Sequence, residues 1–316
     1  MTSSQVPNSL RSVAIIQDAP VAFDTAATLQ RAVEAIHAAR DARLIVFPEA
    51  FIGGYPKGID FGARIGMRSP EGREWFRRYS AGAICVPGKE TERLATAARD
   101  AAAVVVIGVI ERLGKTLFCS ALTFAEDGHL LANHRKTMPT AMERLIWGQG
   151  DGSTLGPVNT SVGVVGTAIC WENYMPQLRL ALYAGGVQLY CAPTVDDRDS
   201  WIPTVRHIAM EGRCFVLSAC QFARRSDYPA DYAPVQGDDP ATVLIRGGSC
   251  IVDPLGNLLA GPLYHEAAIL RAGLDLQAID RAALDLDVVG HYARPDLFQL
   301  RVNRQPQIAV SNQPIA

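Results

Sequence analysis

The sequence of 316 residues lacks a long apolar run, a surplus of either charge and an apolar segment at its start. Its longest apolar run begins at Ala101 and is too short to cross a bilayer, which needs about 20 residues. Thirty basic residues stand against 32 acidic ones, which argues against a basic surface for nucleic acid. Residues 1–10 are polar and lack the apolar core of an export signal. We therefore expect a cytoplasmic protein without a membrane or nucleic-acid partner.

Paired metal-binding motifs are also missing. The seven cysteines are scattered, and no two have the CxxC spacing of a zinc site. No HxxxH pair or His–Cys cluster is present, so the sequence predicts no metal site. An odd number of cysteines without an export signal argues against a disulfide framework. The simplest interpretation of most of them is a buried free thiol that packs as a small apolar side chain.

The apolar pattern alternates between short β-branched runs and longer helical stretches. It predicts helices at 24–40, 91–102, 175–184 and 201–211. It predicts strands at 12–17, 44–47, 104–110, 117–124, 130–134, 164–169, 187–192, 214–219, 248–252 and 258–260. Turn sequences at 114–115, 127–128 and 253–256 indicate antiparallel hairpins. We expect an α/β fold with helices layered on sheets, as a single domain at 1–305 followed by a tail at 306–316.

Three reactive side chains follow predicted strands. Glu49 comes after the strand at 44–47 and a proline, where loops build sites, although a helix cap or a salt bridge would explain an isolated glutamate. Lys136 follows the strand at 130–134, and taken alone it would be a solvated charge. Together with a cysteine, a glutamate can act as general base and a lysine can stabilise negative charge.

Cys170 is the cysteine that differs from the other six. It ends the strand at 164–169 just before a predicted helix, where free backbone N–H groups should lower the pKa of a thiol and make it a nucleophile. A packing role is the alternative. Cys85 and Cys119 have no acid or base partner that the sequence places beside them. No histidine is convincingly placed either, because His134 points the wrong way along its strand if Lys136 reaches the site through a turn.

Three segments carry a family resemblance. Phe47-Pro-Glu49, His134-Arg-Lys136-x-x-Pro and Cys170-Trp-Glu172 resemble the signature segments of the nitrilase branch of the carbon–nitrogen hydrolase superfamily. Blocks at 51–57, 143–153, 211–221 and 289–295 extend the likeness, which is closest to plant nitrilases and their bacterial relatives. The resemblance implies a four-layer α-β-β-α sandwich and no metal or organic cofactor.

The resemblance also implies roles for individual residues. Cys170 would be the nucleophile, Glu49 the general base and Lys136 the cation that stabilises the tetrahedral intermediate. Glu143 would be a second carboxylate that orients either Lys136 or the attacking water. The backbone N–H of Trp171 would complete the oxyanion site. The residues expected around the substrate are Tyr55, Trp147, Trp171, Pro193 and Thr194.

The expected reaction is hydrolysis of an organic nitrile to the carboxylic acid and ammonia through a covalent cysteine thioimidate, with some amide as by-product. An amidase or carbamoylase of the same superfamily would share the glutamate, lysine and cysteine. A catalytically silent assembly protein on this fold is the third interpretation. The resemblance further implies a homo-oligomer built from dimers, in spirals or filaments, with the helix at 175–184 as a dimer surface. Aliphatic, aromatic, arylaceto and cyanoamino-acid nitriles all remain candidate substrates.

Overall fold

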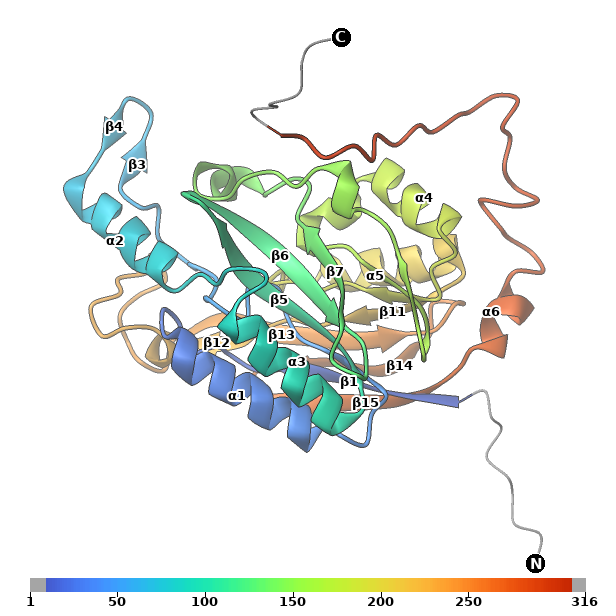
Figure 1. Cartoon of the computed structure of the whole chain (residues 1–316), viewed down its shortest axis with the longest axis horizontal. Coiled ribbons are helices and arrows are strands. Elements are labelled where there is room, and N and C mark those ends of the chain that lie inside the picture. Colours follow the sequence, from blue (N-terminus) through green and yellow to red (C-terminus); the bar gives the residue numbers. More distant parts are fainter. Residues whose placement is uncertain (1–9, 309–316) are drawn as a thin grey trace, which may run out of the picture.

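The computed structural model describes residues 10–308, and two β-sheets form its centre (Figure 1). One sheet has the order β15 (Ala268–Asp275), β1 (Leu10–Gln17), β2 (Leu44–Val46), β5 (Val104–Leu113), β6 (Thr116–Phe124), β7 (Leu130–Arg135). The other has the order β12 (Phe222–Arg224), β13 (Val243–Val252), β11 (Phe215–Ser218), β10 (Leu189–Cys191), β9 (Gly163–Thr167), β8 (Val158–Thr160), with β14 (Leu258–Tyr264) paired to β13. A small ribbon joins β3 (Ala63–Arg64) and β4 (Met67–Arg68). The helices are α1 (Thr25–Ala38), α2 (Pro70–Ala81), α3 (Lys89–Ala101), α4 (Pro176–Ala184), α5 (Trp201–Gly212) and α6 (Gln277–Ala282).

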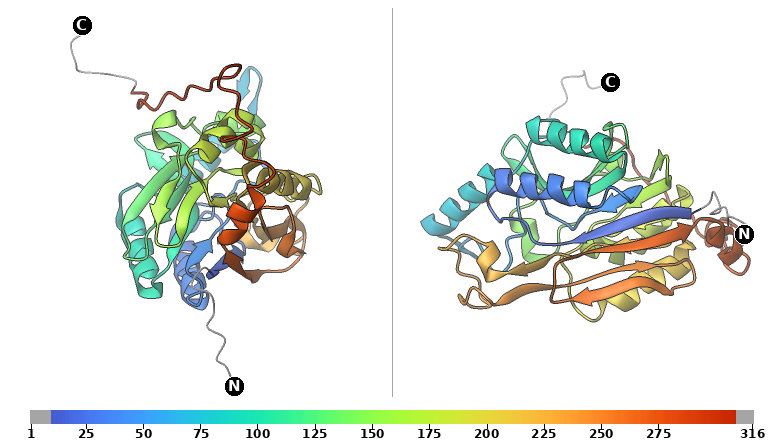
Figure 2. Two further views of the ribbon diagram at one scale, coloured as in Figure 1. Left: turned by 90° about the vertical axis from the view of Figure 1, so that its right-hand side faces the viewer. Right: turned by 90° about the horizontal axis from the view of Figure 1, so that it is seen from below.

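Three apolar layers hold the sheets and helices together. Along β1, side chains alternate between the two faces of the sheet. Ile16 packs toward α1 and α3, whereas Ile15 packs toward the second sheet. On the far side of the second sheet, Val216 packs with the residues of α4 and α5. Helices therefore cover the outer face of each sheet, and the chain forms the expected α-β-β-α sandwich (Figure 2).

Strand pairing is parallel in the middle of each sheet and antiparallel outside it. β1, β2 and β5 are parallel, as are β9, β10 and β11. The three expected hairpins are confirmed, because β5 pairs with β6, β6 with β7, and β13 with β14 in antiparallel register. Each of these strands contains one apolar run of the prediction, and a turn sequence between two such runs makes the second strand antiparallel to the first.

Two large elements have no counterpart in the sequence-based prediction. Helix α2 begins with a Ser69 cap and Pro70, but it buries only Gly72 and Tyr79, so it has no continuous apolar stripe. Strand β15 pairs with β1 over eight residues and closes one edge of the first sheet. Its exposed Arg271 and Gly273 alternate with Leu270, Ala272 and Leu274, a pattern that the sequence-based prediction did not recognise.

The chain after α6 forms an extended arm that crosses the molecule beside α4 (Figure 1). Arg304 donates to the carbonyl oxygen of Leu155, and the backbone N–H of Gln307 donates to Asp151 Oδ2 at 2.7 Å. Residues 283–308 contain no helix or strand, and positions 309–316 of the expected tail lie outside the described residues. No helix within 10–308 is both long and apolar enough to span a bilayer.

Candidate active site

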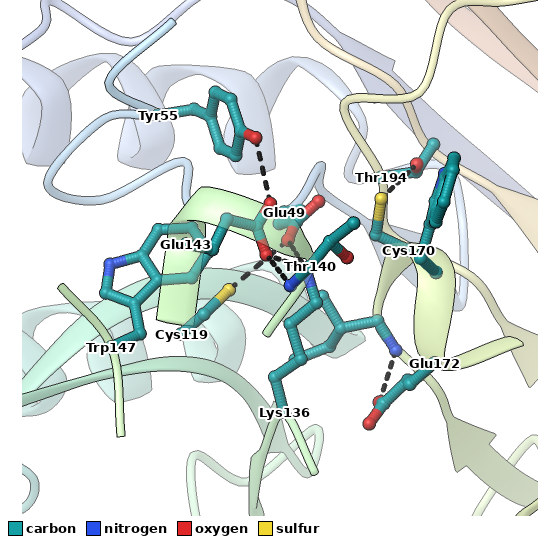
Figure 3. A network of polar contacts seen from close by, with 12 residues as sticks. Glu49, Tyr55, Cys119, Lys136, Thr140, Glu143, Trp147, Cys170, Glu172 and Thr194 are labelled. Atoms are coloured by element: carbon teal, nitrogen blue, oxygen red, sulfur yellow. Dashed lines mark hydrogen bonds and ion pairs between the residues drawn. The ribbon is translucent and has the colours of Figure 1, made fainter. Parts of the chain in front are cut away.

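Three strand ends meet between the two sheets and bring the predicted groups together (Figure 3). Glu49 follows β2, and Lys136 directly follows β7 in the same sheet. Because β7 is two antiparallel steps from β5, it runs in the same direction as β2 and ends at the same edge. Cys170 follows β9 of the other sheet and opens a 3₁₀ turn, Cys170–Tyr174.

Glu49 is fully buried and held on two sides. Its Oε1 accepts a hydrogen bond from Lys136 Nζ at 2.7 Å, and its backbone carbonyl accepts one from Gln221 Nε2 at 2.7 Å. The Cys119 thiol also lies 3.5 Å from Oε1, which gives Cys119 an acidic partner that the sequence did not place beside it. Its partner is 70 positions away in the chain, a separation at which sequence spacing carries no signal.

Lys136 lies between two carboxylates. Its ammonium donates to Glu143 Oε2 at 2.8 Å, as well as to Glu49. Glu143 in turn accepts hydrogen bonds from the Tyr55 hydroxyl at 2.8 Å and from the Thr140 backbone N–H at 2.6 Å. These contacts fix Glu143 against the ammonium, so of its two expected roles the resting geometry favours orientation of Lys136.

The charges of this buried cluster depend on one another. Burial raises the pKa of Glu49, and the Lys136 ammonium opposes that rise without cancelling it. Burial acts to lower the pKa of Lys136, but the carboxylates of Glu49 and Glu143 outweigh it and leave this pKa well above its ordinary value. Lys136 therefore stays protonated, and Glu49 is a stronger base than an exposed carboxylate.

Cys170 has a left-handed backbone conformation, with φ of 50°. Its N–H donates to the Pro193 carbonyl at 2.8 Å, and Asn173 Nδ2 donates to the carbonyls of Ala168 and Cys170, each at 2.8 Å. These bonds offset the strain of a non-glycine residue at positive φ. The Thr194 hydroxyl lies 3.2 Å from the sulfur.

The expectation of a lowered thiol pKa is wrong. Burial and the nearby Glu49 carboxylate raise the pKa of Cys170, and the Lys136 ammonium only partly offsets them. Because the turn lies between two packed sheets, desolvation outweighs the backbone N–H groups that the sequence suggested. A thiol of this kind needs a base at the moment it attacks.

A buried pair outside the predicted set joins the lysine and cysteine segments. His134 Nε2 lies 2.6 Å from Glu172 Oε1, which also accepts the Ile169 backbone N–H at 2.5 Å. The other oxygen of Glu172 accepts the backbone N–H and the hydroxyl of Thr137 at 2.8 and 2.7 Å. His134 was not convincingly placed as a thiol partner from its sequence, and both His134 and Glu172 belong to the signature segments of the resemblance.

A pocket of about 260 Å³ opens above the sulfur. Of the predicted substrate residues, Tyr55 and Trp171 line it. Trp147, Pro193 and Thr194 are absent from its lining: Trp147 packs edge-on against Tyr55, and Pro193 and Thr194 contact Cys170 from behind. Further lining residues, most of them next to predicted ones in the chain, are Lys57, Thr140, Val195, Asp196, Asp197 and Arg198.

Trp171 stands at the pocket rim, 38% exposed. Its indole N–H donates to Asp196 Oδ2 at 2.8 Å, and the Arg198 guanidinium stacks 4.4 Å from the ring. Arg198 also pairs with Asp196, so the three side chains form one clamp. Contacts within the chain itself therefore hold the rim in place.

The comparisons with known proteins agree with this geometry. Residues 12–283 match the carbon–nitrogen hydrolase family. An "Aliphatic nitrilase" of Sinorhizobium fredii (strain HH103) is 58% identical over 299 residues, which cover 94% of this chain and 97% of that relative. The "Bifunctional nitrilase/nitrile hydratase NIT4B" of Nicotiana tabacum is 51% identical, over 91% of this chain and 84% of that relative.

The fold is similar to that of a solved structure as well. The C. elegans NitFhit protein superimposes with a TM-score of 0.73 at 20% identity, over 96% of this chain and 70% of the other. At that identity the likeness supports the fold alone. Since the family match spans most of the chain and close relatives cover nearly all of it, the chain belongs to the carbon–nitrogen hydrolase family.

Proposed function

We propose that this protein is a nitrilase that hydrolyses a small organic nitrile to its carboxylic acid and ammonia, with Glu49, Lys136 and Cys170 as its catalytic residues. The observation that supports these roles is the buried cluster itself, in which the Lys136 ammonium lies between the Glu49 and Glu143 carboxylates, next to a pocket lined by Glu143 and Cys170. Nitrilase relatives at 58% and 51% identity support the reaction.

The first half of the reaction forms a bond between sulfur and carbon. Glu49 takes the thiol proton as Cys170 Sγ attacks the nitrile carbon. One π bond of the nitrile breaks, and its nitrogen gains negative charge that the Lys136 ammonium and the Trp171 backbone N–H stabilise. Glu49 then returns that proton to the nitrogen, and a neutral thioimidate remains on the enzyme.

The second half consumes two waters. The first adds to the thioimidate carbon, and the nitrogen, once protonated, leaves as ammonia to give a thioester. Glu49 then takes a proton from the second water as it attacks the thioester, and the acid leaves with regeneration of the thiol. Glu143 keeps Lys136 in place to stabilise the negative charge that develops on the nitrogen, and later on the oxygen, of each adduct.

A nitrile panel tests this function. We expect ammonia and acid from at least one aliphatic nitrile, since a pocket of about 260 Å³ suits a small substrate. Aromatic, arylaceto and cyanoamino-acid nitriles complete the panel. Cys170→Ser should keep its circular dichroism spectrum and lose turnover. Absence of ammonia from every nitrile by folded wild-type protein would refute the proposal.

Release of some amide is a second outcome of the same site. The relative from Nicotiana tabacum is named for both nitrilase and nitrile hydratase activity, and its 51% identity favours a mixed product here. Amide forms when the tetrahedral intermediate expels the thiolate before ammonia. Measuring acid and amide from matched nitrile and amide substrates separates this mixed product from an amidase or carbamoylase.

We also infer a cytoplasmic homo-oligomer built from dimers, with α4 as part of the dimer surface. The supporting observation is apolar exposure next to α4, where Leu180 lines a hollow together with the exposed Tyr292 and Phe298. Size-exclusion chromatography should give a mass above 34.1 kDa. A fully active monomer would contradict the assembly.

A further inference from the structure

Lys57 occupies a rigid place beside the pocket. Its carbonyl accepts a hydrogen bond from the Tyr232 hydroxyl at 2.6 Å, and the carbonyl of Tyr55 accepts one from the Tyr228 hydroxyl at 2.8 Å. The Lys57 backbone N–H closes the turn by donating to the Tyr55 carbonyl at 2.8 Å. The main chain at Lys57 is therefore fixed at both ends of a short turn.

Lys57 is one of the residues that line the same pocket as Cys170. It also lines an adjoining hollow of about 280 Å³, which shares Tyr55 and Glu143 with that pocket. The residue is half-buried, and its ammonium makes no hydrogen bond or ion pair with any side chain within residues 10–308. Lys57 thus belongs to the lining of two adjoining hollows and forms no ion pair within residues 10–308, not even with Asp60 of the second hollow.

The other cations around the pocket are neutralised. Lys136 is paired with Glu49 and Glu143, and Arg198 is paired with Asp196. The remaining acid of the lining is Asp197. Its Oδ2 accepts a hydrogen bond from the backbone N–H of Arg246 at 3.0 Å, and its negative charge interacts electrostatically with the Arg246 guanidinium. The acids that line the pocket are therefore engaged by residues other than Lys57.

We propose that Lys57 binds a carboxylate carried by the substrate at the end remote from its nitrile, so that the preferred substrates are short aliphatic cyano-carboxylates. This inference rests on the proposed nitrilase function and deepens it. An ammonium that already lacks a counter-ion gains a charge-assisted hydrogen bond from such a substrate, whereas a neutral chain leaves it unpaired. Lys57 is a residue that determines specificity, remote from the reacting atoms.

The test compares each cyano-carboxylate from 3-cyanopropanoate to 6-cyanohexanoate with a neutral isostere in which an isopropyl group replaces the carboxylate. For at least one chain length, wild-type enzyme should have the higher kcat/KM for the acid. Lys57→Met should lower the acid-to-isostere ratio at that length by roughly tenfold to a hundredfold, mainly through KM. Lys57→Arg should retain more of the ratio, and added salt should reduce it in wild-type enzyme.

The matched control is Lys89→Met, because the Lys89 side chain is 89% exposed and Lys89 begins α3, outside the pocket lining. This control should keep the wild-type ratio. A wild-type preference for the isostere at every length, or an unchanged ratio in Lys57→Met, would overturn the inference. Failure of the nitrilase proposal gives a different result, since neither acids nor isosteres would then release ammonia.

Discussion

At the scale of single residues, the site depends on charges that neutralise one another out of water. Lys136 has no exposed surface, and both of its carboxylate partners lie within 2.8 Å. A buried charge whose partner is removed is left uncompensated and costs free energy. Substitutions in this cluster therefore affect both the chemistry and the folded state.

Lys136→Met should lower kcat/KM for the best nitrile by roughly a hundredfold to a thousandfold, the usual effect of losing one group that stabilises developing charge. The substitution also leaves Glu49 and Glu143 as neighbouring carboxylates without their shared cation. Steady-state ammonia release gives the measurement, and the exposed Lys89→Met again serves as control. Activity within threefold of wild type would exclude Lys136 from the reaction.

The buried His134–Glu172 pair should make stability depend on pH. Burial alone would lower the pKa of His134, but Glu172 outweighs it and the net pKa is raised. A raised pKa in the folded state adds stability that is complete below the unfolded value of about 6.5 and is lost as pH rises through the folded value. The corresponding effect on Glu172 has the opposite sign: its pKa is lowered despite burial, because His134 is beside it, so its contribution is lost at acid pH.

His134→Gln should therefore destabilise the protein by about 3–5 kcal/mol near pH 6 and by less near pH 9. Urea unfolding at both pH values measures this difference. His129→Gln is the matched control, because the His129 side chain is 84% exposed beside Asp127. An equal loss at the two pH values would show that the charge of His134 contributes nothing.

At the scale of secondary-structure elements, close backbone packing sets the position of Glu49, the proposed general base. Gly108 lies in β5, where an added Cβ atom would be 2.3 Å from the Pro48 carbonyl oxygen and 2.7 Å from Glu49 Cα. The chain leaving β2 thus lies directly on β5. A side chain at Gly108 would move the carboxylate away from Lys136.

Gly108→Ala should lower stability by about 1–3 kcal/mol, as overpacking does, and should reduce turnover more than tenfold. Gly273→Ala in β15 is the matched control, since its nearest contact for an added Cβ is Leu10 Cδ2 at 3.7 Å. Thermal unfolding and initial rates give the two readouts. Wild-type rates in Gly108→Ala would mean that the approach of β2 to β5 does not position Glu49.

Some of these elements could be predicted from the sequence and others could not. Strands and hairpins such as β5–β6–β7 follow from local alternation and turn residues. Helix α2 and strand β15 do not, because α2 buries little and β15 depends on pairing with β1 from the opposite end of the chain. Likewise, Glu49, Lys136 and Cys170 could be identified from their segments, whereas Lys57 and Arg198 enter the pocket only through tertiary packing.

At the scale of the whole molecule, the layered fold separates the seven cysteines by access. Cys85 is exposed, and Cys170 is buried but lines the pocket. The other five are Cys119, Cys191, Cys214, Cys220 and Cys250, all buried in the described residues. Burial raises the pKa of Cys191, Cys214 and Cys250 as it does that of Cys170, so access through the pocket, and not the pKa, distinguishes Cys170.

Iodoacetamide should therefore alkylate native protein at Cys85 and Cys170 and leave the other five thiols unmodified until the chain unfolds. Peptide mass spectrometry locates the modified positions, and ammonia release is followed in parallel. Activity should fall as Cys170 is modified. Unmodified Cys85→Ser protein should be as active as wild type. Inactivation that follows Cys85 alone would contradict the assignment of the nucleophile.

The sequence by itself indicated the class of fold, the positions of most strands along the chain and, through its family resemblance, the candidate glutamate, lysine and cysteine. These properties reside in local alternation, turn residues and short signature segments. Only the tertiary structure decided the protonation of Cys170, the partner of Cys119, the His134–Glu172 link and the unpaired charge of Lys57. The physical reason is that desolvation and charge pairing depend on what surrounds a group in space, and the two sheets bring together residues from distant parts of the chain.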